Sequence, residues 1–540
     1  MKQWRLALPL LAAALLVGCG PSGGSSGGGF SQRGREGGQS GTFTYPINTN
    51  PTTFDPHVVQ DGDTIDLLQN VYEGLVTWNE QNEVAPALAE SWSVSDDGLT
   101  YTFKIKKGVK FHNGREVTAE DFKWSIERCC QSTFTSPTAG AYLNDIIGVE
   151  EKLAGKVKSV DGVKVVDPQT LALTLKQKTP YFLGKLTYMV SVPLPKESVP
   201  LDKELTKIEE MIGTGPFKVA STLRDQETTL EAFAEYHGGA PKLTKIVRPV
   251  VKDNTTVLAK YRNGEIQLAR LQRTDIAGVE KDPALKGQLK LLDRPSIWYI
   301  GMNQKAYPPF KDRRVRRAFA MAIDRLTIVK ERMGGVNQPA KGILPPGVMG
   351  HREEAGFIEF NPAEAKKLLA EAGFPEGKGL PPLEMYFREQ FPDIRLVAEA
   401  AAGMLKENLG VDVKLRSLEW RNYLEKFNKE ELPFYHMRWA ADFLDPQNFL
   451  SNMLATWGPE NKLGYNNPEF DKLCREADAT MEWEKRKPLY EKAEDIALQD
   501  APWIPIYFQR DAELHSASLS GMRGSVFGHL PHTTTEVSSK

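Results

Sequence analysis

The sequence predicts an α/β protein that is divided into two or three domains. Its 540 residues are too many for one hydrophobic core, which rarely grows beyond about 250–300 residues. Apolar residues recur at helical spacing over 395–409, the pattern stops at Gly410, and a strand pattern follows at 411–415. A helix that passes through a glycine into a strand is a usual connection in parallel sheets, so we expect such a sheet.

The N-terminus reads as a processing segment that is removed rather than folded. Lys2 and Arg5 precede an apolar run at 6–16, which has the length of a signal peptide and is too short to span a bilayer. The run ends in the sequence LVGC, which resembles the lipobox of bacterial lipoproteins. The resemblance implies a lipoprotein signal peptide at 1–18 and a lipid on Cys19. The alternative is an ordinary secretory signal that contains a cysteine.

A tract rich in glycine and serine follows at 19–41 and is predicted to be a tether. Such a composition cannot bury a core and behaves as a flexible coil, with a reach of about 25 Å for this length. A lipid anchor and a soft tether would hold the folded part beside a membrane. No later segment has a long uncharged apolar run, so we expect no helix that spans the membrane.

The charge balance and the cysteines narrow the class further. The chain has 68 Lys and Arg against 70 Asp and Glu, with no basic block or stripe, which argues against a nucleic-acid partner. Beyond Cys19 only Cys129, Cys130 and Cys474 remain. Three cysteines give an exported protein no disulfide framework, so we interpret them as buried or reduced and leave their pairing open.

Strand and helix signals alternate along the rest of the chain. The signals for strands lie at 42–47, 100–105, 297–300 and 502–508, with a hairpin at 163–175. Those for helices lie at 63–76, 308–323 and 361–371, after Thr118 with Asp121 in a capping box, and after Asn467. The four arginines at 313–317 are interpreted as a solvated helix face. The break GTGPF at 213–217 permits tight backbone and indicates a crossing between domains.

The segment 436–449 (HMRWAADFLDPQNF) is the strongest candidate for a binding site. Trp439 offers a flat apolar face, Asp442 follows three residues later, and Asp445 with its following proline ends and turns the segment. An aromatic ring beside a carboxylate suits an amine-bearing ligand, because the ring covers the apolar part and the carboxylate pairs with the ammonium. Core packing next to a helix cap is the other interpretation of these residues.

Short motifs spread over nearly the whole chain carry a family resemblance. They are DP at 55–56, VYEGLV at 71–76, the stretch 87–128, GTGPF at 213–217, GMN at 301–303, VRRAFAMAIDR at 315–325, AGFPEGKGLPP at 372–382, WAADFLDPQNFL at 439–450, GYNNPEFD at 464–471 and DAPWIPIY at 500–507. In this order they resemble the extracytoplasmic solute-binding proteins of ABC transporters, in the large oligopeptide- and dipeptide-binding class. Order and spacing, rather than any single motif, make the match.

The resemblance implies a two-lobed periplasmic-binding-protein-like (type II) fold with an additional domain beside lobe I. It places lobe I at 42–80, 213–296 and 502–540, the additional domain at 81–212 and lobe II at 297–501. It further implies that a solute, a short peptide first of all, binds between two lobes that close over it. The protein would then deliver this peptide to an ABC permease in the membrane, outside the cytoplasm, as a monomer and without a cofactor.

The resemblance also assigns a binding residue. In peptide-binding members an Asp after a Trp-x-x pattern holds the α-ammonium of the ligand, and that residue here is Asp442. Its neighbours Trp439, Ala440, Arg438 and His436 complete the predicted ligand-binding set. Backbone groups of the same segment are expected to pair with the ligand main chain.

The rest of the ligand is left open by the sequence. Some peptide-binding members have ADY or GDxxDP where this chain has ADFLDP, and the class also contains binders of nickel chelates and oligosaccharides. No residue matches the partner of a peptide carboxylate. Arg388, Arg416 and Arg438 are the candidates, and each also has a structural interpretation.

Three other functions compete with peptide binding. An enzyme is disfavoured because none of the eight histidines lies in a GxSxG, HExxH or Cys-His context. Metal uptake could use His436, or His529 with His532, although good sites need three or four ligands. A sugar site needs aromatic platforms, for which the candidates are Trp298, Trp439, Trp457 and Trp503.

Overall fold

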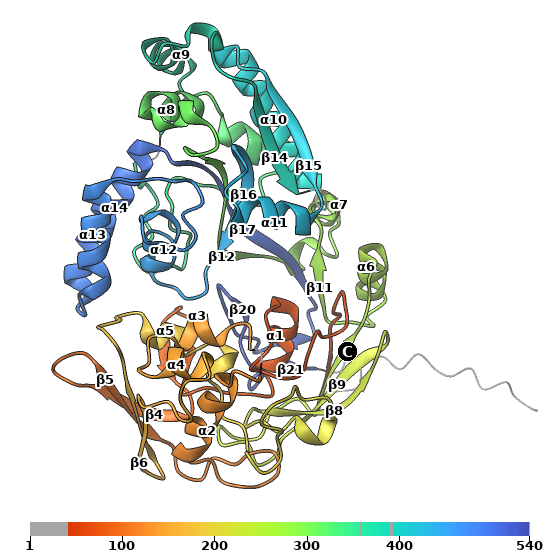
Figure 1. The fold of residues 1–540 in the computed structure, drawn as a ribbon. Helices are drawn as coiled ribbons and strands as arrows, with labels where there is room; N and C mark the ends of the chain where they lie inside the picture. The colour runs from red at the N-terminus through yellow and green to blue at the C-terminus, as the bar shows by residue number, and fades with distance from the viewer. Residues whose placement is uncertain (1–40, 135, 357, 389–391, 539–540) are drawn as a thin grey trace, which may run out of the picture. The chain divides into compact units, whose positions relative to one another are not determined.

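Two long strands, β12 (Leu289–Met302) and β17 (Trp503–His515), pair antiparallel at the centre of the computed structural model (Figure 1). They belong to a seven-stranded mixed sheet of order β11–β17–β12–β16–β14–β15, with β13 paired to β17. Its other strands are β11 (Leu268–Leu271), β13 (Gln338–Pro339), β14 (Leu383–Arg388), β15 (Val413–Leu418) and β16 (Phe434–Ala440). β14 runs parallel to β15, and α10 (Pro392–Leu409) connects them through Gly410. The predicted helix–glycine–strand unit is confirmed.

Two four-stranded sheets lie outside the seven-stranded sheet. One has the order β1 (Thr42–Thr44), β10 (Lys245–Pro249), β9 (Glu227–Ala232), β8 (Phe217–Leu223). The other has the order β4 (Ala89–Val94), β5 (Thr100–Ile105), β7 (Thr170–Thr174), β6 (Val163–Asp167), which contains the predicted hairpin. Three small pairs complete the strands: β2 (Val76–Trp78) with β3 (Val84–Pro86), β18 (Leu519–Ser520) with β21 (Glu536–Val537), and β19 (Gly524–Ser525) with β20 (Gly528–His529).

The helices cover these sheets. They are α1 (Gly62–Leu68), α2 (Ala119–Cys129), α3 (Ala139–Leu143), α4 (Val149–Leu153), α5 (Phe182–Lys185), α6 (Asn254–Arg262), α7 (Arg273–Lys281), α8 (Arg313–Met321), α9 (Pro362–Glu371), α10, α11 (Trp420–Asn428), α12 (Ser451–Leu454), α13 (Pro468–Ala479) and α14 (Trp483–Asp500). The predicted caps are present. Asn361 accepts from the amide of Glu364 at 3.1 Å, and the amide of Thr118 donates to Asp121 at 2.9 Å.

The structure describes residues 41–134, 136–356, 358–388 and 392–538, which belong to one compact unit. The predicted signal peptide at 1–18, Cys19 and the predicted tether up to residue 40 lie outside the described residues. Within them, no helix combines the length and the apolar character needed to cross a membrane.

The three larger sheets pack against separate hydrophobic cores, one on each face of the seven-stranded sheet. Along β17 alternate residues face opposite sides of the seven-stranded sheet, so Ile504 packs into one core and Trp503 into another. The sheets around β5 and β10 bury a core each. β12 runs through the predicted boundary at 296/297, and β17, which the sequence assigns to lobe I, lies inside the seven-stranded sheet. The division of the chain at these residue numbers stays a prediction.

The helix predicted over 63–76 is too long. α1 covers only Gly62–Leu68, because the chain beyond it makes tertiary hydrogen bonds. The carbonyls of Asn70 and Val71 accept from backbone amides in the GTGPF segment, at 2.9 Å each. At Gly213 of that segment a Cβ would lie 1.9 Å from the carbonyl oxygen of Val71, so only glycine fits this close approach.

The predicted helix at 308–323 begins as a 3₁₀ turn, Pro308–Lys311, and continues as α8. The prediction that its arginines form a solvated face is wrong at Arg316, which is 4% exposed. Its guanidinium donates to the carbonyls of Phe310 (2.7 Å) and Asp500 (2.8 Å). Buried carbonyl groups at the ends of neighbouring elements require hydrogen-bond donors, and Arg316 supplies them. The spacing of apolar residues along one helix cannot predict this requirement.

The three cysteines of the described chain are buried and free, as interpreted from the sequence. The sulfurs of Cys129 and Cys130 lie 3.9 Å apart. Burial raises the pKa of the Cys474 thiol well above its ordinary value. A protonated buried thiol is unreactive, so Cys474 is a packing residue.

A fully buried ion pair joins α2 to the loop after β1. Arg128 donates to both carboxylate oxygens of Asp55, at 2.6 and 3.1 Å, and both side chains are 0% exposed. The same guanidinium donates to the carbonyls of Pro200 (2.7 Å) and Lys203 (2.8 Å). Charges removed so completely from water depend on these partners.

We predict that Asp55→Asn strongly destabilises the fold. The substitution leaves the Arg128 guanidinium buried without its counter-charge, which costs about 3–5 kcal/mol. Urea unfolding followed by tryptophan fluorescence would show the lower midpoint. The control is Glu425→Gln, which removes the exposed pair with Lys429 and should leave the midpoint unchanged. Equal midpoints for the two variants would contradict the prediction.

Candidate functional site

A cavity of about 1100 Å³ lies where segments far apart in the sequence meet, and we call it the cleft. One wall comes from α1 and the turns up to Trp78, and another from Tyr142 and 187–189. The end of β16 contributes Arg438 and 440–442. The C-terminal stretch contributes several residues between Arg523 and Thr533.

Asn448 fixes the backbone at the end of β16. Its side-chain oxygen accepts from the indole N–H of Trp439 (3.1 Å) and from the amide N–H of Asp442 (3.0 Å). Its side-chain amide donates to Oδ2 of Asp442 at 3.2 Å. Asn448 belongs to a 3₁₀ turn, Pro446–Asn448, that Asp445 caps. The Asp-Pro pair that the sequence marks as a turn therefore brings Asn448 back to Asp442.

The Asp442 carboxylate also accepts a hydrogen bond from a distant segment. Oη of Tyr142, in α3, donates to Oδ1 of Asp442 at 3.1 Å. The ring of Tyr142 stacks on that of Tyr188, with centroids 3.9 Å apart. Oη of Tyr188 in turn donates to the carbonyl of Val59 at 3.1 Å. Two stacked, anchored rings thus hold the phenol against the carboxylate.

The electrostatic setting of Asp442 suits a cationic ligand. The side chain is exposed to the cleft, yet protein surrounds it closely. Burial raises the pKa of the carboxyl, and the hydrogen bonds from Asn448 and Tyr142 oppose that rise. Among the described residues its hydrogen-bond partners are neutral, so an ammonium would be its direct counter-charge.

The predicted set divides between the cleft and the core behind it. Arg438 and Ala440 line the cleft with Asp442, whereas Trp439 and His436 do not. Trp439 points to the other face of β16 and packs against the core. His436 is 1% exposed, with its ring 5.5 Å from that of Trp298. Neither ring lines the cleft in this structure, since His436 is buried and Trp439 is partly buried, and the contact of these two residues with a ligand stays a prediction.

Burial and the nearby Arg388 lower the pKa of His436 to about 3. The ring is therefore neutral at physiological pH. Neither ring nitrogen has a hydrogen-bond partner within the described part of the chain. Among the described residues His436 belongs to no group of three or more side chains that could hold a metal, so the metal-binding interpretation of His436 gains no support.

Of the three arginines considered for a ligand carboxylate, only Arg438 lines the cleft. Arg416, on β15, forms an ion pair with Glu384 at 2.8 Å and is exposed elsewhere on the sheet. Arg388 lies over the ring of Trp420, 4.6 Å from its centroid.

The aromatic residues considered for a sugar platform do not line the cleft either. The four tryptophans named from the sequence are absent from the described lining residues, and Trp78 is present instead. Trp298 and Trp503 are buried in the core. Trp457 is exposed outside the cleft, and Arg475 lies over one face of its ring, 3.7 Å from the centroid.

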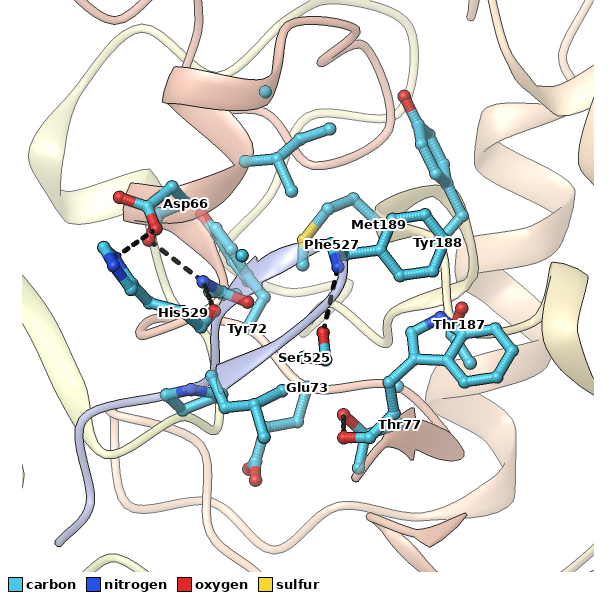
Figure 2. Close-up of a pocket in the computed structure, with 18 of the residues that line it drawn as sticks. Asp66, Tyr72, Glu73, Thr77, Thr187, Tyr188, Met189, Ser525, Phe527 and His529 are labelled. Carbon is cyan, nitrogen blue, oxygen red and sulfur yellow. Dashed lines mark hydrogen bonds and ion pairs between the residues drawn. The ribbon is translucent and has the colours of Figure 1, made fainter. Parts of the chain in front are cut away.

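The hairpin β19–β20 forms an aromatic wall of the cleft. Phe527, at its turn, is 38% exposed, and its ring centroid lies 5.6 Å from that of Trp78. Figure 2 labels Phe527 together with Tyr188 and Met189, which also line the cleft. This wall offers apolar contact for a ligand, and no sequence pattern near 436–449 points to it.

His529 anchors the hairpin to the rest of the fold. Its Nδ1 lies 3.4 Å from Asp66 in α1, and its Nε2 lies 3.0 Å from Glu513 in β17 (Figure 2 draws the contact with Asp66). Burial lowers the pKa of His529, but the two carboxylates outweigh it and raise the pKa to about 9. His532, considered with His529 as a metal pair, is buried and contacts Oη of Tyr45 at 3.1 Å instead.

The atoms of Glu513, His515 and His529 that could bind a metal lie within 4.8 Å of one another. The surrounding charges disfavour a dication. Nε of Arg270 is 3.4 Å and Nη2 of Arg294 is 3.7 Å from the Glu513 carboxylate. With His529 protonated as well, the cluster is balanced as an ion-pair network.

The class of protein follows from comparison with known families. Residues 83–461 match the model of the bacterial extracellular solute-binding proteins, family 5 Middle. This match spans more than half of the chain, so the chain belongs to the family 5 bacterial extracellular solute-binding proteins.

Individual relatives match over nearly their whole length. The chain is 30% identical to the oligopeptide-binding protein OppA of Bacillus subtilis, covering 96% of this chain and 97% of the relative. It is 31% identical to the dipeptide-binding protein DppE of the same organism, covering 98% of both. It is also 31% identical to heme-binding protein A of Haemophilus influenzae, covering 97% of both.

Among solved structures, the unliganded open form of the periplasmic murein tripeptide-binding protein MppA superposes with a TM-score of 0.80. The two sequences are 27% identical over 93% of this chain and 98% of that chain. The two-lobed periplasmic-binding-protein-like fold expected from the sequence is confirmed.

We predict that the charge on His529 makes the stability of the fold depend on pH. Its pKa of about 9 lies above the ordinary value of about 6.5, so the imidazolium stabilises the fold fully below pH 6.5. That contribution, about 3 kcal/mol, is lost as pH rises through 9. We expect the melting temperature of the wild type to fall more between pH 7 and 9.5 than that of His529→Gln.

The control is His112→Gln. Burial lowers the pKa of His112 to about 4, so this residue is neutral throughout that range and its variant should keep the wild-type slope. A slope in His529→Gln equal to that of the wild type would show that His529 is not charged in the folded protein.

Proposed function

We propose that the cleft captures short peptides and that the protein serves as the substrate-binding component of an ABC importer. The observation that carries the proposal is the environment of Asp442. Its carboxylate opens into the cleft, accepts hydrogen bonds from neutral groups, and is held in place by Asn448 and Tyr142. A desolvated ammonium needs such a fixed carboxylate, and every linear peptide with a free N-terminus supplies one. The peptide-binding relatives OppA and DppE support the assignment.

The backbone of β16 supports the same proposal. β16 pairs with β12 along its whole length but with β14 only at Phe434 and Tyr435. In the described structure the second edge of β16 beyond Tyr435 therefore has no strand partner. An extended peptide can add to a free edge through main-chain hydrogen bonds, which hold it without reading its side chains.

The cellular setting is also a proposal. The sequence LVGC and the tract that follows support an extracytoplasmic protein, held on a membrane by lipid on Cys19. A monomer whose two lobes close over peptide would present the closed surface to the permease, so that ligand shifts an open–closed equilibrium.

Replacing Asp442 tests the ammonium site. Asp442→Asn keeps the shape but removes the counter-charge, and we expect it to weaken tri-alanine binding by about 2–5 kcal/mol, or roughly 30-fold or more. Isothermal titration calorimetry of the purified protein measures the change. N-acetylated tri-alanine should bind the wild type as weakly as tri-alanine binds the variant.

The matched control is Glu73→Gln. Glu73 lines the same cleft, but its carboxylate already pairs with His237 (3.0 Å) and Tyr236 (2.8 Å). This variant should retain tri-alanine binding. An equal loss of tri-alanine affinity in both variants would contradict a specific ammonium site at Asp442. It would show that Asp442 only adds to the negative potential of the cleft. Binding of heme in preference to all peptides would replace the proposed ligand by that of the heme-binding relative.

Replacing Cys19 tests the proposed anchor. Cys19→Ser removes the thiol that would carry lipid, so the protein should move from the membrane fraction to the soluble extracytoplasmic fraction. Incorporation of radiolabelled palmitate into the wild type, and its loss in the variant, measures lipidation directly. Cys474→Ser, at a buried free thiol, is the control and should keep the label.

A further inference from the structure

Phe443 follows Asp442 in the chain and takes part in a contact between distant segments. Its side chain is 6% exposed, and among the described residues it belongs to none of the hydrophobic cores that cover the larger sheets. Its ring stacks on that of Tyr181, with centroids 5.3 Å apart and planes 4° from parallel. Phe443 is therefore buried by a partner from another part of the chain rather than by the core of its own sheet.

Gly184 makes the close approach of the two segments possible. It lies in α5, and a Cβ placed on it would be 3.3 Å from Cβ of Phe443 and 3.5 Å from the ring of Trp78. A larger residue at this position would push α5 away from Phe443. Tyr181 and Gly184 together form a socket for the Phe443 side chain.

The same segments also meet at Asp442. Oη of Tyr142, in α3, donates to its carboxylate at 3.1 Å. Burial raises the pKa of Asp442, and the charge of Lys185, in α5, is among the influences that oppose this rise. Both helices lie in the stretch 81–212 that the sequence assigns to the additional domain, whereas Asp442 and the residue after it lie in the stretch assigned to lobe II. Two consecutive residues thus serve the proposed ammonium site and the contact between these stretches.

The socket lies outside the cleft. Asp442 lines the cleft, whereas Phe443, Tyr181 and Gly184 are absent from its described lining residues. A ligand that fills the cleft therefore reaches Asp442 without touching the stacked rings. The stack can act on binding only through the relative position of the segments that carry it.

We propose that Phe443 and its socket form a latch between lobe II and the additional domain, and that this latch stabilises the closed arrangement that holds ligand. This inference rests on the proposed function, in which the lobes close over a peptide. Because the stack favours the closed arrangement whatever the cleft holds, it raises the affinity for every ligand by the same factor. Phe443 is thus a positioning residue, whereas Asp442 distinguishes a free amine from an acetylated one.

A pair of cysteines tests whether the latch opens and closes. In the double variant Gly184→Cys, Phe443→Cys the two Cβ atoms lie 3.3 Å apart, near the span of about 3.5–4.5 Å in disulfides, and the three native thiols of the described chain are buried. The purified protein is oxidised with and without saturating tri-alanine, and the cross-linked fraction is followed with time. We expect tri-alanine to speed cross-linking about 10-fold or more. The oxidised protein should retain the peptide through gel filtration and release it on reduction.

Calorimetry of ring variants measures what the stack contributes. Phe443→Leu keeps an apolar side chain but loses the stacked ring. We expect tri-alanine and N-acetylated tri-alanine to bind this variant about 3- to 10-fold more weakly, each by the same factor. Tyr181→Leu should give a similar loss, and the double variant little further loss, because either change removes the whole stack.

The matched control is Phe427→Leu. Phe427 is 4% exposed, and its ring stacks on that of Tyr423 with centroids 6.4 Å apart, but both residues belong to α11 and to one core. This variant should lower the melting temperature and leave the affinity for tri-alanine unchanged. Melting curves of all the variants confirm that they are folded.

The outcomes separate the latch from the proposed function. Cross-linking at one rate with and without tri-alanine, or no cross-linking at all, in a protein that binds this peptide overturns the latch and leaves the proposed function standing. A loss in Phe443→Leu that is confined to the free amine also overturns the latch, because it shows that Phe443 only orients Asp442. A wild type that binds no tri-alanine overturns the proposed function and the latch with it.

Discussion

The pairing of β12 with β17 is the contact on which the rest of the structure depends. Its register runs from Leu289 opposite Leu514 to Gly301 opposite Trp503, with an irregularity between Asp293 and Ile297. Pro295 lies inside that irregularity and has no N–H to give to a ladder. The same interruption holds residues that line the cleft. The longer of the two irregularities in this pairing therefore lies where the sheet meets the cavity, and the shorter one lies in the core between Trp298 and Tyr299.

Buried charges give this centre its second constraint. Arg248 contacts Asp66 at 2.9 Å, Asp66 contacts His529, and His529 contacts Glu513, so a chain of ion pairs links β10, α1, β20 and β17. Such groups are costly to desolvate and are stable only as a complete set. His529 thereby ties the hairpin that bears Phe527 to α1 and β17, and the hairpin forms part of the cleft wall.

The sequence predicted those features of the fold that depend on residues close together in the chain. The caps at Thr118 and Asn361, the hairpin at 163–175 and the parallel unit around Gly410 each depend on residues close together in the chain, and all are present. Arg438, Ala440 and Asp442, which the sequence singled out as ligand-binding residues, line the cleft, and their contact with a ligand stays a prediction. The alternation of side chains along a strand could have predicted that Trp439 lies on the opposite face from Arg438. It could not have predicted that the ring of Trp298 packs against His436.

What the sequence could not provide comes from segments brought together only by folding. Tyr142 reaches Asp442 from 300 residues away, and His529 joins carboxylates from two distant elements. Asn448 is a partial exception, because an Asp-Pro turn predicts that the chain reverses close to Asp442 without specifying which side chain returns. Arg316 was predicted from the amphipathic pattern of its helix to face solvent. It is buried instead, because its guanidinium donates to buried carbonyl groups.

The hairpin β19–β20 has a consequence for the order of folding. Its residues 523–533 form one wall of the cavity, but they are anchored by contacts with elements far away in the chain. Until α1 and β17 are in place, His529 has neither of the carboxylates that hold it, Asp66 and Glu513. The cavity can therefore be completed only after the sheet and α1 have assembled.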